Sequence, residues 1–523
     1  MKPEELNISK EKFVFANQAS NMHDKELSTK PISYLHDAWN RFKKNKASIT
    51  AAVIIGILVL FAILAPLFSK YTVSYNDTYF RGTLPKTSIS EKLNWNFYDG
   101  CEKKEFSIDK FVYYYAMGLE TGHYAVKNNK YTIVDRQNEH NKRIETYYKI
   151  RLDTYQMNGT VFKKLNYDEY IALQKYQDET GIQVIYPTTQ IDKRPEIDEE
   201  NANYWYEVSD DCKINLEKDA DGNYDLSGIK NIYQPYSGKD GYNSLRIEEN
   251  GEKLYDYAIL KQNDTQYEVR VNYYEYYIYY HSQVLKDGIT KPMFLFGTAA
   301  NNGQDIFTCL ASGARFSFLL AVGVSVINLL VGAIYGAIEG YYGGKIDLVM
   351  ERFVEILSAV PFMIVITLLR YHMKDSSQIL ILFIAFFLTG WIGMAGRTRM
   401  QFYRFKNQEY VLAARTLGAS DKRIMFKHIF PNSLGTLITS CVLVIPGVIF
   451  SETSLSYLGI INLSTGNLTS VGTLLANGQS YLTTYPHMIV PPAVFISLLM
   501  LSFNLFGNGL RDAFNPSLRG AEE

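Results

Sequence analysis

Few residues of this chain have the types and spacing that catalysis requires. The stretch closest to a phosphate-binding loop, GYYGGKID at residues 340–347, lacks the GxxxxGK spacing and the hydroxyl residue that cradle a phosphate. No HExxH pattern or nucleophile elbow is present, and none of the 4 cysteines forms a CxxC pair or lies near a histidine cluster. The net charge of −1 gives no field that would attract nucleic acid. We therefore expect a chain that is not an enzyme, holds no metal or cofactor and binds no nucleic acid.

The clearest pattern is the basic, amphipathic stretch EYVLAARTLGASDKRIMFKHIFPN at residues 409–432, called the basic loop below. Its periodicity predicts a short helix, a glycine suited to a left-handed residue, and a second helix that must stop before Pro431. Ser420 or Asp421 can cap that second helix. Small side chains around the elbow, Gly418-Ala419-Ser420, would leave a smooth knob for a groove on another protein. The residues assigned to docking are Tyr410, Ala413, Ala414, Arg415, Gly418, Ala419, Ser420, Asp421 and Pro431.

Six apolar segments are expected to cross a membrane. The first has about 20 residues, which matches the ~30 Å hydrocarbon layer. It starts too far from the N-terminus, and is too long, for a cleaved signal peptide. Residues 71–300 contain no apolar run long enough to span. The segments lie at residues 48–70, 316–338, 353–369, 379–395, 434–450 and 488–506.

Basic residues give the orientation of these segments. Four border the first segment and eight lie within residues 396–433, whereas residues 371–378 contain one lysine. Because cytoplasmic loops are enriched in Lys and Arg, we expect a multi-pass protein of the cell membrane, with residues 396–433 in the cytoplasm. A loop that only fixes this orientation needs charges but no paired helices or glycine elbow, so we favour docking. The expected divisions are a cytoplasmic tail at 1–47, the first helix at 48–70, an extracellular part at 71–300, a five-helix core at 301–507 and a cytoplasmic tail at 508–523.

Small and helix-breaking residues within the segments concern packing. Three glycines recur every four residues and would let another helix approach closely, either as fixed packing, which we favour, or as a moving interface. Prolines in the segments either kink the helices or act as hinges. The glycines are Gly332, Gly336 and Gly340, and the prolines are Pro361, Pro446, Pro491 and Pro492.

The polar part, residues 71–300, is expected to form one α+β domain. Alternating segments such as YTIVDRQ and YEVRVNYYEYYIYY predict strands, and NYDEYIALQKYQDETG predicts a helix. Its tyrosines suit either a recognition surface or a modest core. DADGN at residues 219–223 fits a hairpin turn better than a calcium loop. Cys101 and Cys212 either form a disulfide outside the cell or remain two buried thiols.

The basic loop resembles the EAA loop of importer permeases of the ATP-binding cassette (ABC) class. That pattern, E-A-A, three residues, G, nine residues, I-x-L-P, falls on Ala413, Ala414, Gly418 and Pro431. Leu412 replaces the glutamate, His428 the isoleucine and Phe430 the leucine, departures that the C-type subunits of the peptide-permease branch tolerate. DAWNRFKKNK, GARFSFLLAVG, GYYGGKIDLVMERFVEILSAVPF, SETSLSYLG and NGLRDAFNPSLRG also resemble that branch. The resemblance covers roughly residues 31–70 and 295–520 and leaves 71–294 unexplained.

This resemblance implies an α-helical polytopic membrane protein of the type I ABC importer permease class, carrying an α+β insertion. It implies a peptide importer in which this chain pairs with a second permease and contacts lipid. Two separate ATPase subunits would bind ATP and Mg²⁺ and receive the basic loop, and an extracellular peptide-binding lipoprotein would supply peptide. Glu452 would either face the translocation path or cap its helix at the interface. Two alternatives remain: a membrane-anchored extracellular binding or sensory protein, and a permease of the same branch for another cargo such as nickel or a sugar.

Overall fold

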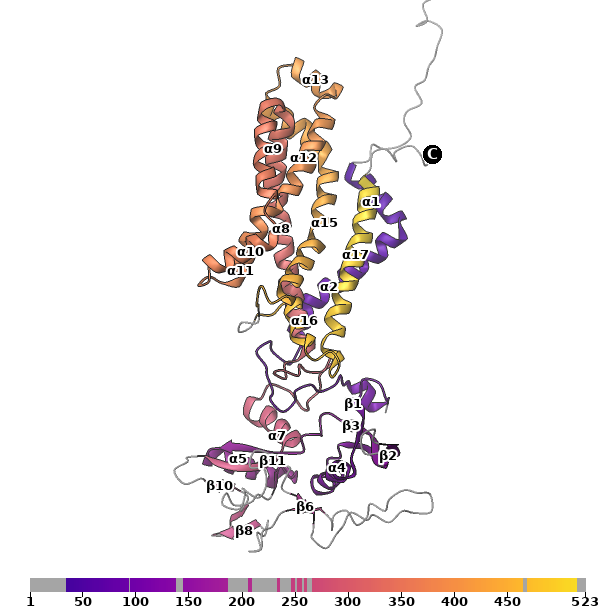
Figure 1. Ribbon diagram of the computed structural model, residues 1–523, viewed down its shortest axis with the longest axis vertical. Helices are drawn as coiled ribbons and strands as arrows, with labels where there is room; N and C mark the ends of the chain where they lie inside the picture. The colour runs from indigo at the N-terminus through magenta and orange to yellow at the C-terminus, as the bar shows by residue number, and fades with distance from the viewer. Residues whose placement is uncertain are drawn as a thin grey trace, which may run out of the picture.

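The computed structural model is elongated, with a helix bundle at one end and an α+β part at the other (Figure 1). A narrow region of loops joins the two, and α13 caps the end of the bundle that lies farthest from the sheets. The structure describes residues 34–93, 95–137, 144–186, 206–208, 233–235, 246–249, 252–255, 258–260, 266–463 and 468–514.

The bundle contains five helices that are long and apolar enough to cross a membrane, or six if one bent pair is counted as a span. The long central helix α8 packs against α2, α12 and α15, and α17 packs against α2 and α15. The bundle elements are α1 (Tyr34–Lys44), α2 (Lys46–Phe68), α8 (Ile306–Tyr342), α9 (Gly344–Ser358), α10 (Phe362–His372), α11 (Gln378–Gly390), α12 (Ile392–Phe405), α13 (Glu409–Thr416), α14 (Asp421–Arg423), η7 (Ile424–Ile429), α15 (Phe430–Tyr457), α16 (Val471–Gln479), η8 (Pro486–Met488) and α17 (Val490–Phe514).

The segment predicted as one span at residues 353–369 is broken. Helices α9 and α10 meet at a bend of 71°, and Pro361 is the N-cap residue of α10. Proline disfavours the helical conformation at the preceding residue and cannot donate a backbone hydrogen bond, which explains why α9 ends before it. The bend at Pro361 agrees with the kink or hinge predicted for prolines in these segments, and the sixth span is present if the bent pair is counted as one.

Pro431 has the opposite outcome. The prediction that the second helix of the basic loop stops before Pro431 is wrong, because one helix runs from Asp421 to Tyr457. Its π-helical segment, η7, immediately precedes the proline, and the backbone N–H of Phe430 donates to the carbonyl of Met425, five residues earlier. A π-turn shifts the hydrogen-bond register, so the chain accommodates a proline without ending the helix. Pro446 also lies inside α15.

Within the described residues, the α+β part has two larger antiparallel sheets, each with a core of its own, and two small antiparallel pairs, β6-β7 and β8-β9. The first has the order β1-β3-β2, with α4 packed against it, and the second has the order β10-β11-β4, with β5 also paired to β11. Phe111 and Tyr148 stack in the first core, whereas Phe80 and Tyr277 belong to the second. The α+β content predicted from the sequence is present, and the division into a single domain stays a prediction.

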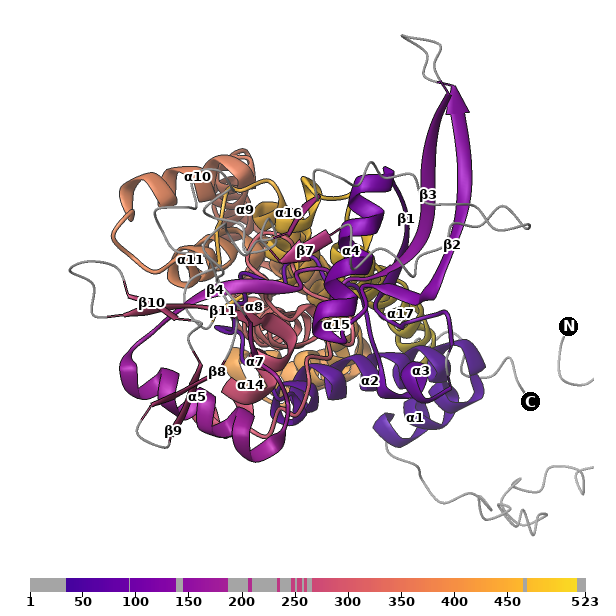
Figure 2. The ribbon, with the colours of Figure 1, turned by 90° about the horizontal axis from the view of Figure 1, so that it is seen from below.

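Figure 2 shows the β2–β3 hairpin projecting from one side of the molecule. The elements of this part are α3 (Ser88–Lys92), β1 (Cys101–Phe106), α4 (Ile108–Thr121), β2 (Val126–Gln137), β3 (Ile144–Asp153), β4 (Thr160–Leu165), α5 (Tyr167–Thr180), β5 (Ile185–Tyr186), β6 (Tyr206–Val208), β7 (Tyr233–Pro235), β8 (Arg246–Glu249), β9 (Glu252–Tyr255), β10 (Ala258–Leu260), β11 (Tyr267–Asn272), α7 (Tyr273–Tyr279) and η6 (Tyr280–Leu285).

Many tyrosines of this part fill cores and make buried hydrogen bonds. Tyr273 and Tyr277 lie beside the ring of Phe80, with ring centroids 5.1 and 5.2 Å away. The hydroxyl of Tyr273 donates to Asp77 at 2.6 Å. Burial raises the pKa of the Tyr71 hydroxyl to about 12. For these residues the core interpretation holds rather than the recognition interpretation.

Candidate functional site

The basic loop forms a compact element at the end of the bundle opposite the sheets (Figure 1). Helix α13 ends at Thr416, and Gly418 follows with φ +79°, a left-handed conformation that a side chain disfavours. The backbone N–H of Ala419 donates to the carbonyl of Ala414 at 3.0 Å, which closes the turn. Ser420 is the N-cap residue of α14 but makes no side-chain capping bond. The glycine elbow between two helices is therefore present.

A small apolar cluster supports the loop from inside. Val411 of α13 and Ile424 and Ile429 of η7 are completely buried. They pack with Tyr341 near the end of α8 and with Phe402 near the end of α12. Because these contacts connect three helices, a displacement of the loop must also move the ends of α8 and α12.

Polar contacts fix the elbow against α8. The hydroxyl of Tyr341 donates to Asp421 Oδ1 at 2.6 Å, so Asp421 is held by a neighbouring helix rather than serving as a cap. The guanidinium of Arg415 lies 5.9 Å from the centre of the Tyr341 ring. Lys406 Nζ donates to the carbonyl of Gly340 at 3.1 Å.

The outward surface of the loop differs from the predicted knob. Leu417 is 87% exposed, and open space surrounds the position where Gly418 would carry a Cβ. Ala413 is exposed, but Ala414 is buried and Ala419 packs against the internal cluster.

Two further residues assigned to docking lie at the far end of the loop. The hydroxyl of Tyr410 accepts a hydrogen bond from Asn432 Nδ2 at 3.2 Å, and Pro431 is exposed within a continuing helix. Neither residue contributes to the elbow. The tip of the loop is formed by the exposed side chain of Leu417 beside Gly418, which has no side chain, rather than by a surface of alanines.

The glycine stripe lies against α12. A Cβ on Gly336 would stand 2.1 Å from the carbonyl oxygen of Ala395, and a Cβ on Gly332 or Gly340 would meet α12 at 2.6 or 2.7 Å. The absence of side chains lets the two backbones touch, as the four-residue spacing predicts.

An ion-pair cluster fixes α9 to α12 beside this contact. Arg399 donates to both carboxylate oxygens of Asp347, at 2.6 and 3.0 Å. It lies 3.0 Å from Glu351 and 3.5 Å from the buried Glu339 of α8. Tyr403 also donates to Asp347. Arg399 is one of the eight basic residues that predict a cytoplasmic loop at residues 396–433, and the i, i+4 spacing of Asp347 and Glu351 is the sequence signal for the cluster.

Glu452 is completely buried within this chain. Its carboxylate accepts hydrogen bonds from Ser317 of α8 at 2.9 Å and from Ser456 at 3.0 Å. Helix α15 continues to Tyr457, so Glu452 does not cap it. Glu452 thus links two helices inside the bundle, and its assignment to the translocation path or substrate entry stays a prediction.

Of the two cysteines considered for a disulfide, the structure describes Cys101 but not Cys212. Cys101 Sγ donates to the carbonyl of Asp99 at 3.7 Å, and burial raises the pKa of its thiol to about 12. Cys212 and the DADGN turn lie outside the described residues, so their assignments remain predictions.

Two family models match the chain. Residues 328–520 match the binding-protein-dependent transport system inner membrane component, and residues 33–85 match the N-terminal TM domain of oligopeptide transport permease C. Residues 86–327 lie outside both matched ranges.

Named relatives agree with these models. The oligopeptide transport system permease protein OppC of Bacillus subtilis is 44% identical over 217 residues, 42% of this chain and 70% of that protein. The dipeptide transport system permease protein DppC of the same organism is 40% identical over 218 residues, 42% of this chain and 67% of that protein. Among solved structures, a chain of the MetNI methionine ABC transporter in an inward facing conformation is similar with a TM-score of 0.32 and 15% identity, over 40% of this chain and 96% of that chain.

Proposed function

This chain belongs to the family of binding-protein-dependent membrane permeases that includes the oligopeptide and dipeptide transport permeases, and from that premise we propose that it is the membrane subunit of an ATP-driven importer of oligopeptides. With a second permease it forms the path for peptide. Two ATPase subunits bind ATP and Mg²⁺ and drive the cycle from the cytoplasm, and an extracellular lipoprotein delivers the peptide. Both termini and the basic loop lie in the cytoplasm, and residues 71–300 lie outside the cell membrane.

The single observation that carries the coupling role is the shape of the elbow. Leu417 projects into solvent beside Gly418, which offers no side chain, while the rest of the loop is fixed from inside by Val411, Ile424 and Tyr341. An exposed apolar side chain on a support that is packed from inside can be buried in a groove of a partner, which is favourable because apolar surface leaves water. The groove that receives it belongs to the ATPase subunit.

The helix that follows the elbow gives the loop mechanical reach. Asp421–Tyr457 is one helix of 37 residues, about 55 Å long at 1.5 Å per residue. A push on Asp421 is therefore delivered to the level of Glu452, where the helix is bonded to α8. Closure of the ATPase pair would reorient the spans through this helix, which is a rigid-body form of coupling.

The test is the substitution Leu417→Asp in the complete complex. Loss of a buried apolar anchor at an interface costs about 2 kcal/mol or more, so the variant should lose co-purifying ATPase subunits and peptide-stimulated ATP hydrolysis in proteoliposomes. Asn407→Asp is the matched control, because it adds the same charge to an exposed position two residues before the basic loop. Full ATPase association by the Leu417→Asp chain would refute the coupling role.

A further inference from the structure

A short segment between the bundle and the first sheet exposes its apolar side chains and buries a polar one. Ile89 and Leu93 are 64% and 55% exposed, and Trp95 and Phe97 are 57% and 72% exposed. Ser90, on the same turn of α3, is 2% exposed. These four large apolar side chains, called the α3 patch below, lie within nine residues of sequence. Such a distribution is the reverse of what contact with water favours.

The α3 patch is held in place by hydrogen bonds and an ion pair. Thr87 and Ser90 form a reciprocal capping box at the start of α3. The hydroxyl of Ser90 also donates to the carbonyl of Tyr98, which closes the loop that carries Trp95. Lys291 pairs with Glu91 at 2.5 Å. The polar groups are thus satisfied internally, and exposure of the apolar groups is a property of the fixed conformation.

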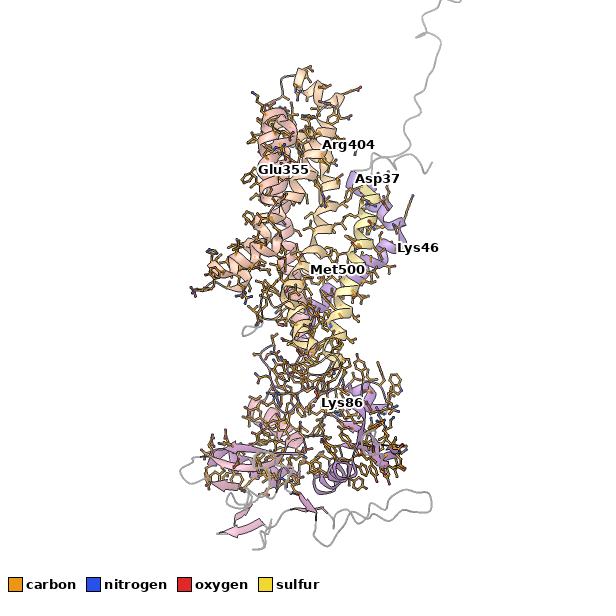
Figure 3. The ribbon with its side chains drawn as sticks, in the orientation of Figure 1. Asp37, Lys46, Lys86, Glu355, Arg404 and Met500 are labelled. Carbon is orange, nitrogen blue, oxygen red and sulfur yellow. The ribbon has the colours of Figure 1, made fainter. Side chains whose placement is uncertain are left out.

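The α3 patch lies close to the end of a membrane-spanning helix. Lys70, just beyond the end of α2, donates to the carbonyl of Gly288 at 2.7 Å. Lys291, which contacts α3, is three residues further along, and three residues of chain span at most ~11 Å. Figure 3 places Lys86, two residues before α3, in the region between the bundle and the sheets.

The lateral position of α3 is also defined. Viewed along the long axis, α3 falls over α1 and α2, at the opposite edge of the molecule from α10 and α11 (Figure 2). Leu67 and Phe68, the last two residues of α2, are 70% and 80% exposed. Exposed apolar side chains are therefore present both at the end of α2 and on the α3 patch.

We propose that the α3 patch inserts into the interfacial layer of the lipid leaflet on the side of the α+β part and anchors that part to the membrane surface. Tryptophan and other aromatic residues concentrate at this layer, where apolar rings meet polar headgroups. The layer reaches roughly 5–8 Å beyond the hydrocarbon, so the anchor requires the patch to lie near the level at which α2 ends. Lys92 is exposed beside the patch and meets the headgroup phosphates. The anchor requires a membrane location but not the proposed transport role.

The experiment uses the fluorescence of Trp95 in the full-length chain, reconstituted into vesicles of phosphatidylcholine with or without brominated acyl chains. The chain has 4 tryptophans, so Trp39, Trp205 and Trp391 are replaced by phenylalanine. The matched control moves the remaining tryptophan to an exposed site away from the bundle, by combining Trp95→Phe with Tyr167→Trp on α5.

The anchor predicts that the fluorescence of Trp95 is quenched in brominated vesicles, lies at shorter wavelength and is shielded from aqueous iodide. The control tryptophan should keep its intensity in brominated vesicles, emit at longer wavelength and be quenched by iodide. Quenching of Trp95 by iodide alone would overturn the proposal. Shielding from both quenchers would also overturn it, because a protein surface would then cover the patch. If the triple replacement prevents folding, the difference between the natural chain and Trp95→Phe gives the same comparison. Leu93→Lys with Phe97→Lys should abolish the lipid quenching.

Discussion

Replacement of Gly336 by alanine tests the close backbone contact between α8 and α12. The added Cβ would lie 2.1 Å from the carbonyl oxygen of Ala395 and 2.9 Å from Thr398 Cβ. Both partners belong to α12, and the nearest atom is backbone, so no flexible side chain can move aside. To bring the nearest contact to even 3.0 Å, α12 must shift by about 0.9 Å.

The cost of that shift follows from the length of the contact. Moving α12 away at Gly336 also opens the contacts at Gly332 and Gly340, where the same backbone is touched. Overpacking a close-packed interface costs typically 1–3 kcal/mol, partly offset because alanine favours a helix by up to about 1 kcal/mol over glycine. We therefore expect a net loss of stability and a lower thermal unfolding midpoint for the purified chain in detergent. The midpoint is measured as the temperature at which half of the chain no longer elutes at its native position in size-exclusion chromatography.

The matched control is Gly396→Ala. Gly396 lies on α12 next to Ala395, and nothing lies within 4 Å of its Cβ position. The helix-propensity gain is the same, but no contact is disturbed, so the midpoint should stay level or rise. If the Gly336→Ala and Gly396→Ala chains unfold at the same temperature, the glycine stripe does not set the distance between α8 and α12, and the steric reasoning fails.

Three other substitutions test the contacts of the loop and the α+β part. Tyr341→Phe removes the hydrogen bond to Asp421, worth about 1.5–3 kcal/mol for a charged partner, and should speed amide hydrogen exchange at the elbow. Burial alone would raise the pKa of Asp99, but the hydrogen bonds from Lys127 and the Cys101 backbone N–H, together with the charges of Lys127 and Arg151, outweigh burial and lower the pKa. The resulting stabilisation is present above the ordinary value of 3.8 and is lost as the pH falls below it. Asp99→Asn should remove that acid sensitivity, measured as urea midpoints at pH 7 and pH 3. Phe80→Ala empties a completely buried site and should cost ~3–5 kcal/mol in urea unfolding.

Each of these expectations has an outcome that would contradict it. Exchange at the elbow in the Tyr341→Phe chain as slow as in the natural chain would show that Asp421 needs no partner. An Asp99→Asn chain with undiminished acid sensitivity would move the effect to other carboxylates. Phe80→Ala should lower the free energy of unfolding far more than Tyr167→Ala, which removes a ring that is 59% exposed. Equal losses would show that burial of Phe80 in the second core does not stabilise the α+β part.

Features that depend on nearby residues were predictable from the sequence. The apolar lengths of α2, α8 and α17 and the position of the elbow depend on neighbours within one or two turns. Gly418 was predictable because a left-handed residue after a short helix selects glycine by local sterics. Gly336 was predictable because four-residue spacing places small residues on one helix face.

The two prolines show where local information ends. Pro361 interrupts a helix and Pro431 does not, although both follow helical segments. The difference lies in the π-turn at η7, which is packed on Tyr341 and Phe402 from distant parts of the chain. The local sequence indicates that a proline destabilises a helix, but it does not show the tertiary contacts that offset this cost.

Burial and pairing of charges were decided by the tertiary structure. The buried carboxylate of Glu452 accepts a hydrogen bond from Ser317, which is 135 residues away in sequence. Arg399 pairs with Asp347, which is 52 residues away in sequence. The α3 patch is also visible only in the fold, since Ile89 and Phe97 in sequence look like ordinary core residues. By itself the sequence determined the apolar spans and the glycine elbow, because these follow from periodicity, composition and local sterics, whereas the orientation stays a prediction from charge. The tertiary structure decided which side chains meet solvent, because exposure depends on what the rest of the chain covers.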